Sequence, residues 1–179
     1  MIAIRRWAGG VLGAVQGTER YRRLARVFAW KVRTAEASEK DLKAIGGWRE
    51  FRAHGCFPYN PHVTNFVVRV GCATVGFAQL VFQLKGSLFH KWWIYRVYVR
   101  PAFRRMGAGE ALMRAAIERA RSLGSKNLAL LVYEENIGAL KLYSKLGFKI
   151  NPVLGSEKDL DREAQVNGWR RVAMSLDLS

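Results

Sequence analysis

The stretch RPAFRRMGAGEALM, residues 100–113, sets two glycines where a strand-like run passes into a helix-like run. Glycine inside a helix costs about 0.5–1 kcal/mol relative to alanine, so Gly107 and Gly109 need a reason. Either the backbone turns tightly here, or a bulky anion comes close to it. The first N–H groups of a helix lack partners and the helix dipole is positive at that end, so this place suits a phosphate. Arg104 and Arg105 add positive charge.

Two well-known glycine motifs do not fit this stretch. A P-loop needs the string GxxxxGK[ST], which the sequence does not contain. A dinucleotide fingerprint needs a third small residue where Leu112 stands. A phosphate site of another kind and a tight turn that binds nothing both remain open at this point.

Hydrophobic patterns predict one continuous series of strands and helices, without a linker or a repeat. Strands are expected at 27–34, 63–70, 73–82, 92–99, 127–133, 148–150 and 170–178. Gly71 and Cys72 join the second and third of these strands as a hairpin, residues 51–62 form a loop, and residues 151–168 form a polar excursion. The order of elements predicts an α/β (α+β) fold, with a mixed sheet covered by helices. A Rossmann fold and a helix bundle do not fit this order.

Three helices have clear signals at their ends. Ser38, with Asp41 three residues later, predicts a capped helix start, and Asn136 predicts another. Gly124 and Gly147 are placed to end helices. The helix that follows the glycine turn has an apolar face made of Leu112, Met113, Ala116, Ile117, Ala120 and Leu123. The side chains on its solvent-facing side alternate in charge: Glu110, Arg114, Glu118 and Arg121.

The charge of the chain limits its partners. Thirty Lys and Arg residues against 14 Asp and Glu give a formal net charge of +16 and a pI of about 10.5. This balance favours anionic partners and disfavours strongly cationic substrates. The cysteines, Cys56 and Cys72, give no disulfide framework, so we expect a reducing, cytoplasmic location. The longest apolar run, at 77–82, is too short to cross a bilayer.

Residues 1–26 form a basic N-terminal extension, and a domain is expected over 27–179. Apolar residues at helical spacing, with arginines between them, predict a helix in the extension. Three interpretations stay open: a helix packed on the domain, a surface helix for RNA, membrane or a partner, and a cleaved targeting segment.

Two motifs together resemble the GNAT superfamily of N-acetyltransferases. Arg104-x-x-Gly107-x-Gly109 matches the signature [RQ]xxGx[GA], and the preceding VYVRP, residues 97–101, resembles the strand that leads into it. The run EENIGALKLYSKLGF, residues 134–148, resembles the second motif of that family. The resemblance is specific over 94–148 and extends in architecture over about 27–178. It implies a mostly antiparallel sheet of six to seven strands, splayed between the strands at 92–99 and 127–133.

The resemblance also implies a cosubstrate, acetyl-CoA, and residues that hold it. Its pyrophosphate would rest on the turn formed by Arg104, Arg105, Met106, Gly107, Ala108 and Gly109. Its pantetheine arm would pair with the backbone of Val97 and Val99, and Asn136 would hydrogen-bond the arm. Tyr143 would be the general acid for the leaving thiolate, and the Val99 N–H would stabilise the oxyanion.

The general base is the part that the sequence does not supply. The strand at 92–99 has no acidic residue, and Leu131 stands where some family members carry one. Glu134 is a weak candidate, His54 is a runner-up, and an amine that arrives neutral needs no base. No metal site is expected, since His54, His62 and His90 are scattered.

Two functions follow from these observations. The first is an acetyl-CoA-dependent N-acetyltransferase whose acceptor is unidentified: a small molecule, or an amine on a protein or tRNA. The second is a CoA-binding module without transferase activity that holds nucleic acid or an anionic membrane through its basic surface. Trp92 and Trp93 could serve such a module as a stacking platform, although aromatic residues on a strand more often fill a core. A homodimer is compatible with either function.

Overall fold

The computed structural model describes residues 31–46, 63–83, 92–152 and 157–179. The expected extension at 1–26 and the loop at 51–62 lie outside these ranges, as do His54, Cys56, His62 and His90. The boundary between an extension and a domain at residue 27 therefore stays a prediction.

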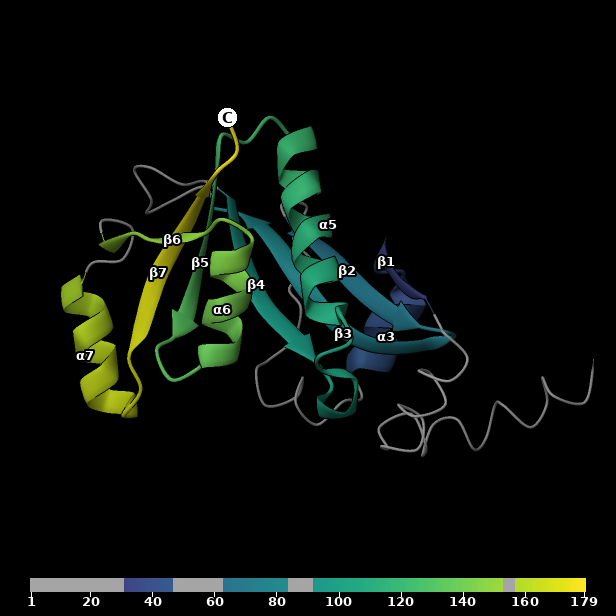
Figure 1. The fold of residues 1–179 in the computed structure, drawn as a ribbon, viewed down its shortest axis with the longest axis horizontal. Coiled ribbons are helices and arrows are strands. Elements are labelled where there is room, and N and C mark those ends of the chain that lie inside the picture. The colour runs from purple at the N-terminus through teal and green to yellow at the C-terminus, as the bar shows by residue number, and fades with distance from the viewer. Residues whose placement is uncertain (1–30, 47–62, 84–91, 153–156) are drawn as a thin grey trace, which may run out of the picture.

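A seven-stranded sheet forms the centre of the molecule, with the strand order β1-β2-β3-β4-β5-β7-β6 (Figure 1). Its strands are β1 (Val32–Glu36), β2 (Val63–Val70), β3 (Ala73–Phe82), β4 (Trp92–Val99), β5 (Asn127–Tyr133), β6 (Lys149–Ile150) and β7 (Arg171–Asp177). Neighbouring strands are antiparallel except β4 and β5, which are parallel. The expected mixed and mostly antiparallel sheet is confirmed.

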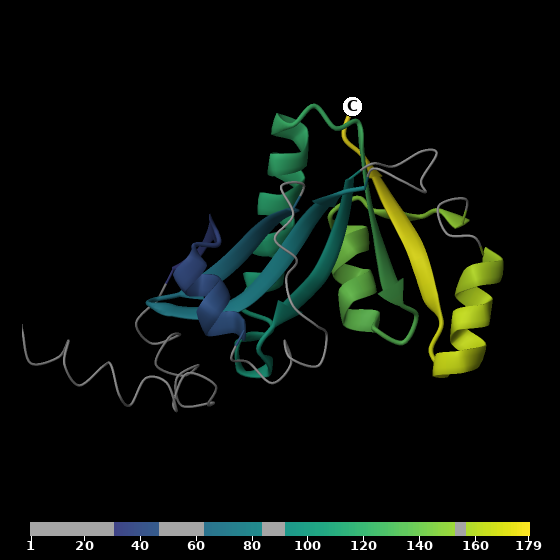
Figure 2. The same cartoon turned by 180° about the vertical axis from the view of Figure 1, so that it is seen from behind.

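Helices lie on both sides of this sheet. Helices α5 (Ala108–Ser122) and α6 (Ile137–Lys145) lie on the near side in Figure 1. Helix α3 (Glu39–Gly46) lies on the opposite side, which faces the viewer in Figure 2, and α7 (Glu157–Asn167) runs beside β7. A short 3-10 turn, η1 (Pro101–Phe103), connects β4 to the glycine turn.

The main core lies between the sheet and α5. Buried residues of α5, such as Leu112, Met113 and Ala116, pack with Val68, Leu80 and other strand residues. This contact explains the apolar face that the sequence predicts, with one correction at its end. Leu123 is 42% exposed, because it is the C-cap residue and lies beyond the last turn of the helix. Gly124, with φ of +71°, ends the helix as expected.

The start of α3 shows how local sequence and long-range contacts combine. The Ser38 N–H donates to Asp41 Oδ2 at 2.9 Å and the Asp41 N–H donates to Ser38 Oγ at 3.3 Å, which together form a capping box. Asp41 also accepts two hydrogen bonds from Arg69 of β2, at 2.6 and 2.7 Å. Burial raises the pKa of Asp41, but the hydrogen bonds from Ser38 and Arg69 outweigh it and hold the pKa below its usual value.

Two expectations, on the first strand and on residues 151–168, need correction. The first strand was expected at 27–34, whereas β1 runs to Glu36. The polar excursion at 151–168 contains helix α7, which the sequence did not predict. Leu160 is its buried apolar residue, so its apolar stripe is too thin to give a helical pattern. Ion pairs from β7 and its lead-in hold the helix: Arg171 contacts Glu163, and Arg170 Nε lies 2.9 Å from Asp161 Oδ1.

Candidate active site

Strands β4 and β5 pair at one end and separate at the other. Their ladder contains three pairs, from Trp92↔Leu128 to Ile94↔Leu130. Beyond it, β4 carries a bulge: Gln79 pairs with Tyr95 and Phe77 with Tyr98, so that two residues of β4 lie opposite one of β3. Arg96 has a φ of +53° at this bulge, a conformation that L-residues adopt rarely. The expected splay between these strands is present, and the bulge bends β4 away from β5.

Past the bulge, backbone polar groups of β4 that do not pair with β3 face the space between β4 and β5, here called the gap. The Arg100 N–H donates to Val75 O at 2.9 Å, and the Tyr98 carbonyl lies against Gly76, so both face β3. Because peptide groups alternate along a strand, the N–H and C=O of Val99 face the gap. Arg104 Nε donates to Val99 O from that side, at 3.1 Å. The gap therefore offers a strand edge for an extended ligand.

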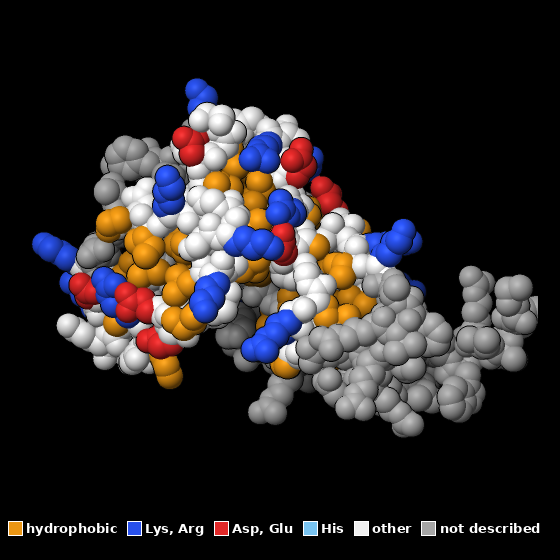
Figure 3. Space-filling model, viewed as in Figure 1, with side chains coloured by type: hydrophobic (Ala, Val, Ile, Leu, Met, Phe, Trp, Pro, Cys, Tyr) orange, Lys and Arg blue, Asp and Glu red, His pale blue; other side chains and the backbone are white. Residues whose placement is uncertain are grey.

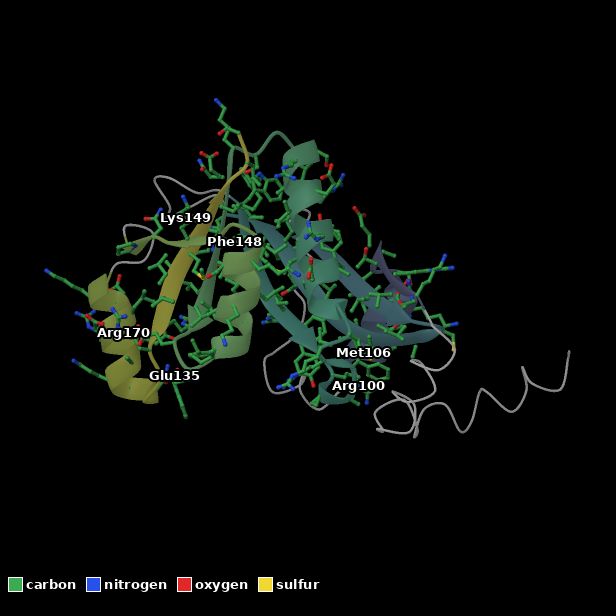
Figure 4. All side chains as sticks on the ribbon, viewed as in Figure 1. Arg100, Met106, Glu135, Phe148, Lys149 and Arg170 are labelled. Carbon is green, nitrogen blue, oxygen red and sulfur yellow. The ribbon has the colours of Figure 1, made fainter. Side chains whose placement is uncertain are left out.

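The turn that follows, residues 104–109, lies at the N-terminal end of α5, where Figure 4 labels Arg100 and Met106. Arg105 has a φ of +61°, and Gly107, the N-cap of α5, has a φ of +80°. Gly107 offers no side-chain cap, and no atom lies within 4 Å of the place where its Cβ would be. Left-handed residues next to a helix start aim several N–H groups into one concavity, which suits an anion.

The two glycines of the turn have different reasons. At Gly109, an added Cβ would lie 3.3 Å from Leu142 Cδ2 of α6 and 3.9 Å from Val99 Cγ2. Gly109 thus lets α5 approach α6 and β4 closely. Open space next to a missing Cβ, which the sequence suggested for both glycines, is found at Gly107.

Two kinds of charged side chain lie near the turn: exposed arginines and a carboxylate held in ion pairs. Arg104 and Arg105 are exposed. Glu110, in the first turn of α5, is held by Lys145 of α6 at 2.7 Å and by Arg114 at 2.8 Å. The hydrogen bond from Lys145, followed by that from Arg114, lowers the pKa of Glu110. The negative charge of Glu110 is therefore balanced by these two cations, and its contact with Lys145 also links α5 to α6.

Tyr143 lies on α6, and Asn136 is the N-cap residue of the same helix. Tyr143 is 6% exposed, and its ring centroid lies 6.1 Å from that of Phe148, which Figure 4 labels just beyond the end of α6. Burial raises the pKa of Tyr143 to about 12. Asn136 Oδ1 accepts from the Ala139 N–H at 3.1 Å, so its expected capping role is confirmed. The side chain is exposed, and its NH₂ donors can still reach a ligand.

Glu134, the weak base candidate, is part of an ion pair. Its Oε1 lies 2.5 Å from Arg170 Nη1, and its backbone N–H donates to Arg170 O at 3.0 Å. Figure 4 labels Arg170 beside α7 and the start of β7, and labels Glu135, which follows Glu134, close to the loop that leads into α6. The hydrogen bonds that Arg170 donates to Asp161 and Glu134 raise the pKa of Arg170. A base at Glu134 would have to give up this partner.

Some expected features fall elsewhere. Trp93 is 6% exposed and stacks on Tyr95 at 6.3 Å, so it fills the interior and offers no surface platform. Sequence reasoning did not single out the bulge at Arg96. A signal was present, because the aromatic residues at 93, 95 and 98 change phase there, from a spacing of two to a spacing of three.

Surface charge on the described residues is dispersed. On the face seen in Figure 3, Lys and Arg side chains are interspersed with acidic and apolar ones and form no single patch. No group of three His, Cys, Asp or Glu side chains within the described ranges is placed to hold a metal ion. Among the helices of these same residues, none combines the length and apolar character needed to cross a bilayer.

Comparison with known proteins places this geometry in a family. The acetyltransferase (GNAT) family matches residues 18–148. An uncharacterized N-acetyltransferase of Methanocaldococcus jannaschii is 38% identical over 79 residues, which are 44% of this chain and 30% of that protein, so the match spans under a third of that relative.

Two solved structures share the fold. The ribosomal-protein-S18-alanine N-acetyltransferase of Escherichia coli is 20% identical with a TM-score of 0.59, over 83% of this chain and 95% of that one. A Bacillus subtilis acetyltransferase in complex with CoA is 18% identical with a TM-score of 0.55, over 84% and 99%. Since the family match covers most of the chain and the fold agrees, this protein belongs to the acetyltransferase (GNAT) family.

Proposed function

We propose that this protein transfers an acetyl group from acetyl-CoA to a primary amine by direct attack in a ternary complex. One observation carries the proposal: the open edge of β4 runs into a turn with left-handed residues at the start of α5, a backbone geometry that suits an anion. A thioester linked to a pyrophosphate through an extended arm has the shape and charge that such a site would take. The CoA bound to the Bacillus subtilis relative supports the same cosubstrate.

Each part of the cosubstrate has a partner in this arrangement. The pyrophosphate would lie on the N–H groups of residues 104–109, with Arg104 or Arg105 adding charge. The pantetheine arm would pair with the backbone of Val97 and Val99, in the place that a strand would occupy. Asn136 would donate from its NH₂ group to a carbonyl of the arm, while its Oδ1 continues to cap α6.

The reaction needs a nucleophile, an oxyanion donor and a proton for sulfur. The amine lone pair attacks the thioester carbon, and the carbonyl oxygen becomes an oxyanion that accepts from the Val99 N–H. Collapse breaks the C–S bond and releases the thiolate, while the nitrogen loses a proton. No residue of the chain needs to act as a nucleophile.

Tyr143 is the proposed proton donor to the sulfur. With a pKa of about 12, its hydroxyl stays protonated at neutral pH and is always available to donate. A thiol has a pKa of about 8.5, so full transfer from this tyrosine runs uphill. The proton that leaves the amine nitrogen must therefore replace the proton that Tyr143 gives to the sulfur. Glu134 remains a weak candidate for the base that moves this proton, since its ion pair with Arg170 competes for the carboxylate.

Thermal unfolding with acetyl-CoA, CoA and ATP tests the cosubstrate first. A ligand at about 100 times its Kd adds roughly 2.7 kcal/mol of stability, which should raise the unfolding midpoint by several degrees. We expect a rise with acetyl-CoA and CoA but not with ATP. No rise with saturating acetyl-CoA would contradict the proposal.

A second function rests on a specific observation. No residue of β4 is acidic, so the strand lacks a carboxylate that could deprotonate an acceptor amine. A CoA-binding module without transferase activity is compatible with that sequence. It would show the rise with acetyl-CoA and no release of thiol with any amine. If it binds RNA, binding should weaken steeply as salt rises.

A further inference from the structure

A row of polar side chains crosses the middle of the sheet. Asn65 of β2 is the register partner of Gln79 of β3, and Gln79 is the register partner of Tyr95 of β4. Gln79 Nε2 donates to Asn65 Oδ1 at 2.8 Å. Gln83 Nε2 donates to the Tyr95 hydroxyl. Asn65, Gln79, Gln83 and Tyr95 are here called the polar row.

The polar row lies on the face of the sheet opposite to α5 and α6. Val67 and Phe77 pack with Ile45 of α3 on that face. Asn65 and Gln79 lie two residues from Val67 and Phe77, so alternation along the strands places them on the same face. The row is therefore separate from the turn and from Tyr143, which packs into the core on the α5 side.

The row ends where β4 and β5 separate. The last pair of their ladder is Ile94↔Leu130, and Tyr95 is the next residue of β4, directly before the bulge at Arg96. A thioester held along the open edge of β4 would thus have Tyr95 and the polar row on one face of the sheet and α6 on the other face. A second substrate that enters from the α3 face meets the polar row first.

The hydrogen bonds of the row leave capacity unused. Gln79 is 4% exposed as a residue. Among the described residues its side chain makes one hydrogen bond, through Nε2, while its Oε1 has no partner there and is not one of the fully buried atoms, so it stays open to a ligand. The Gln83 donor occupies one lone pair of the Tyr95 oxygen and leaves another. Two oxygens near the strand separation can thus accept N–H bonds.

The row carries no formal charge. Its side chains are three amides and one phenolic hydroxyl. Burial raises the pKa of the Tyr95 hydroxyl, and the nearby positive charge of Arg171 offsets part of this rise. Arg171 is in turn paired with Glu163 of α7. Nothing in the row would balance a polycation, whereas a neutral amine or one attached to an anionic group meets no repulsion there.

We propose that Gln79 and Tyr95 hold the acceptor amine, and that the acceptor is a primary amine on a neutral or anionic molecule. This inference rests on the proposed function. Oxygens of the amide and hydroxyl accept the two N–H bonds of the neutral amine. Its lone pair is then left to attack the thioester. Asn65 and Gln83 orient these two side chains.

Acetyl transfer to three amines tests the class of acceptor. Thiol release is measured with glycinamide as the neutral amine, glutamate as the anionic amine and spermidine as the polycation. We expect the wild-type protein to acetylate glycinamide or glutamate at least tenfold faster than spermidine. Faster transfer to spermidine, or transfer to none of the three by a protein that binds acetyl-CoA, overturns the class.

Variants test the residues. Gln79→Met and Tyr95→Phe remove the accepting atoms at nearly constant volume, and Gln165→Met, on the exposed side of α7, is the control. We expect each of the first two to raise the KM of the better amine roughly tenfold, the size of one hydrogen bond, with a smaller change in kcat. Gln79→Glu should shift preference toward spermidine. The rise in unfolding midpoint with acetyl-CoA should stay as in the wild type.

Two failures can be told apart. If the wild-type protein shows neither a rise with acetyl-CoA nor thiol release, the proposed function itself is wrong. If it binds and transfers normally but both variants keep the wild-type KM, the polar row is structural and the inference is wrong. Should Gln79→Met fail to fold, Tyr95→Phe alone decides, because it removes one half-buried oxygen.

Discussion

The two edges of β4 have opposite characters. Toward β3, β4 forms six register pairs and leaves no space, since a Cβ at Gly76 would lie 2.5 Å from Tyr98 O. Toward β5 it forms three pairs and then separates. One strand thus provides both a rigid attachment and an open edge. The bulge at Arg96 is what makes this combination possible, because it bends the strand without releasing the β3 side.

The largest expected effect is on the closed edge. Gly76→Ala places a Cβ against a backbone oxygen that cannot move alone, so β3 and β4 must shift apart. We expect a loss of about 2–3 kcal/mol in the free energy of unfolding, measured with urea, in the upper part of the range for overpacked core sites. Binding of acetyl-CoA should fall with it, because the open edge depends on the position of β4.

Gly138→Ala is the matched control for this change. A Cβ there meets Asn136 Oδ1 at 3.9 Å, which is an ordinary contact, and alanine favours the helix by about 0.5–1 kcal/mol. Equal stability of the two variants would show that the closed edge is more adaptable than the structure implies.

The next effect concerns chemistry at the open edge. Tyr143→Phe removes the proposed proton donor and leaves the ring packed against Phe148. We expect kcat to fall roughly 100-fold, the lower end for general acid catalysis, with little change in the affinity for acetyl-CoA. Tyr133→Phe, at an exposed tyrosine, should change neither quantity. An unchanged kcat in Tyr143→Phe would remove Tyr143 from the mechanism.

The same contrast separates what the sequence predicts from what it does not. The closed part follows from local signals: strand-prone apolar runs at 63–70 and 73–82, with Gly71 and Cys72 between them, give β2 and β3 with their observed bounds. The separation of β4 from β5 came from the family resemblance, since no local pattern encodes a missing strand partner. The bulge depends on how β4 meets β3, which a single run of residues does not report.

Residues whose role depends on distant partners were predicted least well. Helix α7 is held by Arg170 and Arg171, which precede and begin β7, so its polar sequence reads as a loop. Gly109 was interpreted as space for a phosphate, which stays a prediction, and the sequence did not indicate that its missing Cβ also admits Leu142 of α6. In both cases the reason lies in a contact that forms only after the chain has folded.

A smaller effect is expected away from the gap, where α3 is fastened to β2. Asp41→Asn weakens the capping box and the ion pair with Arg69, so we expect a loss of about 1–2 kcal/mol in unfolding free energy. The wild-type pKa of Asp41 is lowered in the folded state. Its contribution is thus present above the unfolded pKa of about 3.9 and is lost as pH falls through the lower folded value.

Urea unfolding at pH 7 and at pH 3 checks this sign. The difference in stability between wild type and Asp41→Asn should shrink at the lower pH, as protons begin to bind the wild-type carboxylate. A difference that grows on acidification would mean that Asp41 is not held by these donors. Acetyl-CoA binding should be nearly unchanged, because α3 lies on the far side of the sheet from the turn.

The smallest effect sharpens the comparison most, because it concerns the residue that now contacts the open edge. Arg104 Nε donates to Val99 O, the carbonyl that a pantetheine arm would need, while its guanidinium is also the proposed phosphate partner. If attraction to phosphate dominates, Arg104→Ala weakens acetyl-CoA binding several-fold, and the loss shrinks as salt screens the charge. Arg162→Ala, on exposed α7, controls for net charge. If the contact with Val99 dominates, Arg104→Ala binds as tightly as wild type or more tightly. The open edge would then be covered by the protein's own side chain until the cosubstrate displaces it.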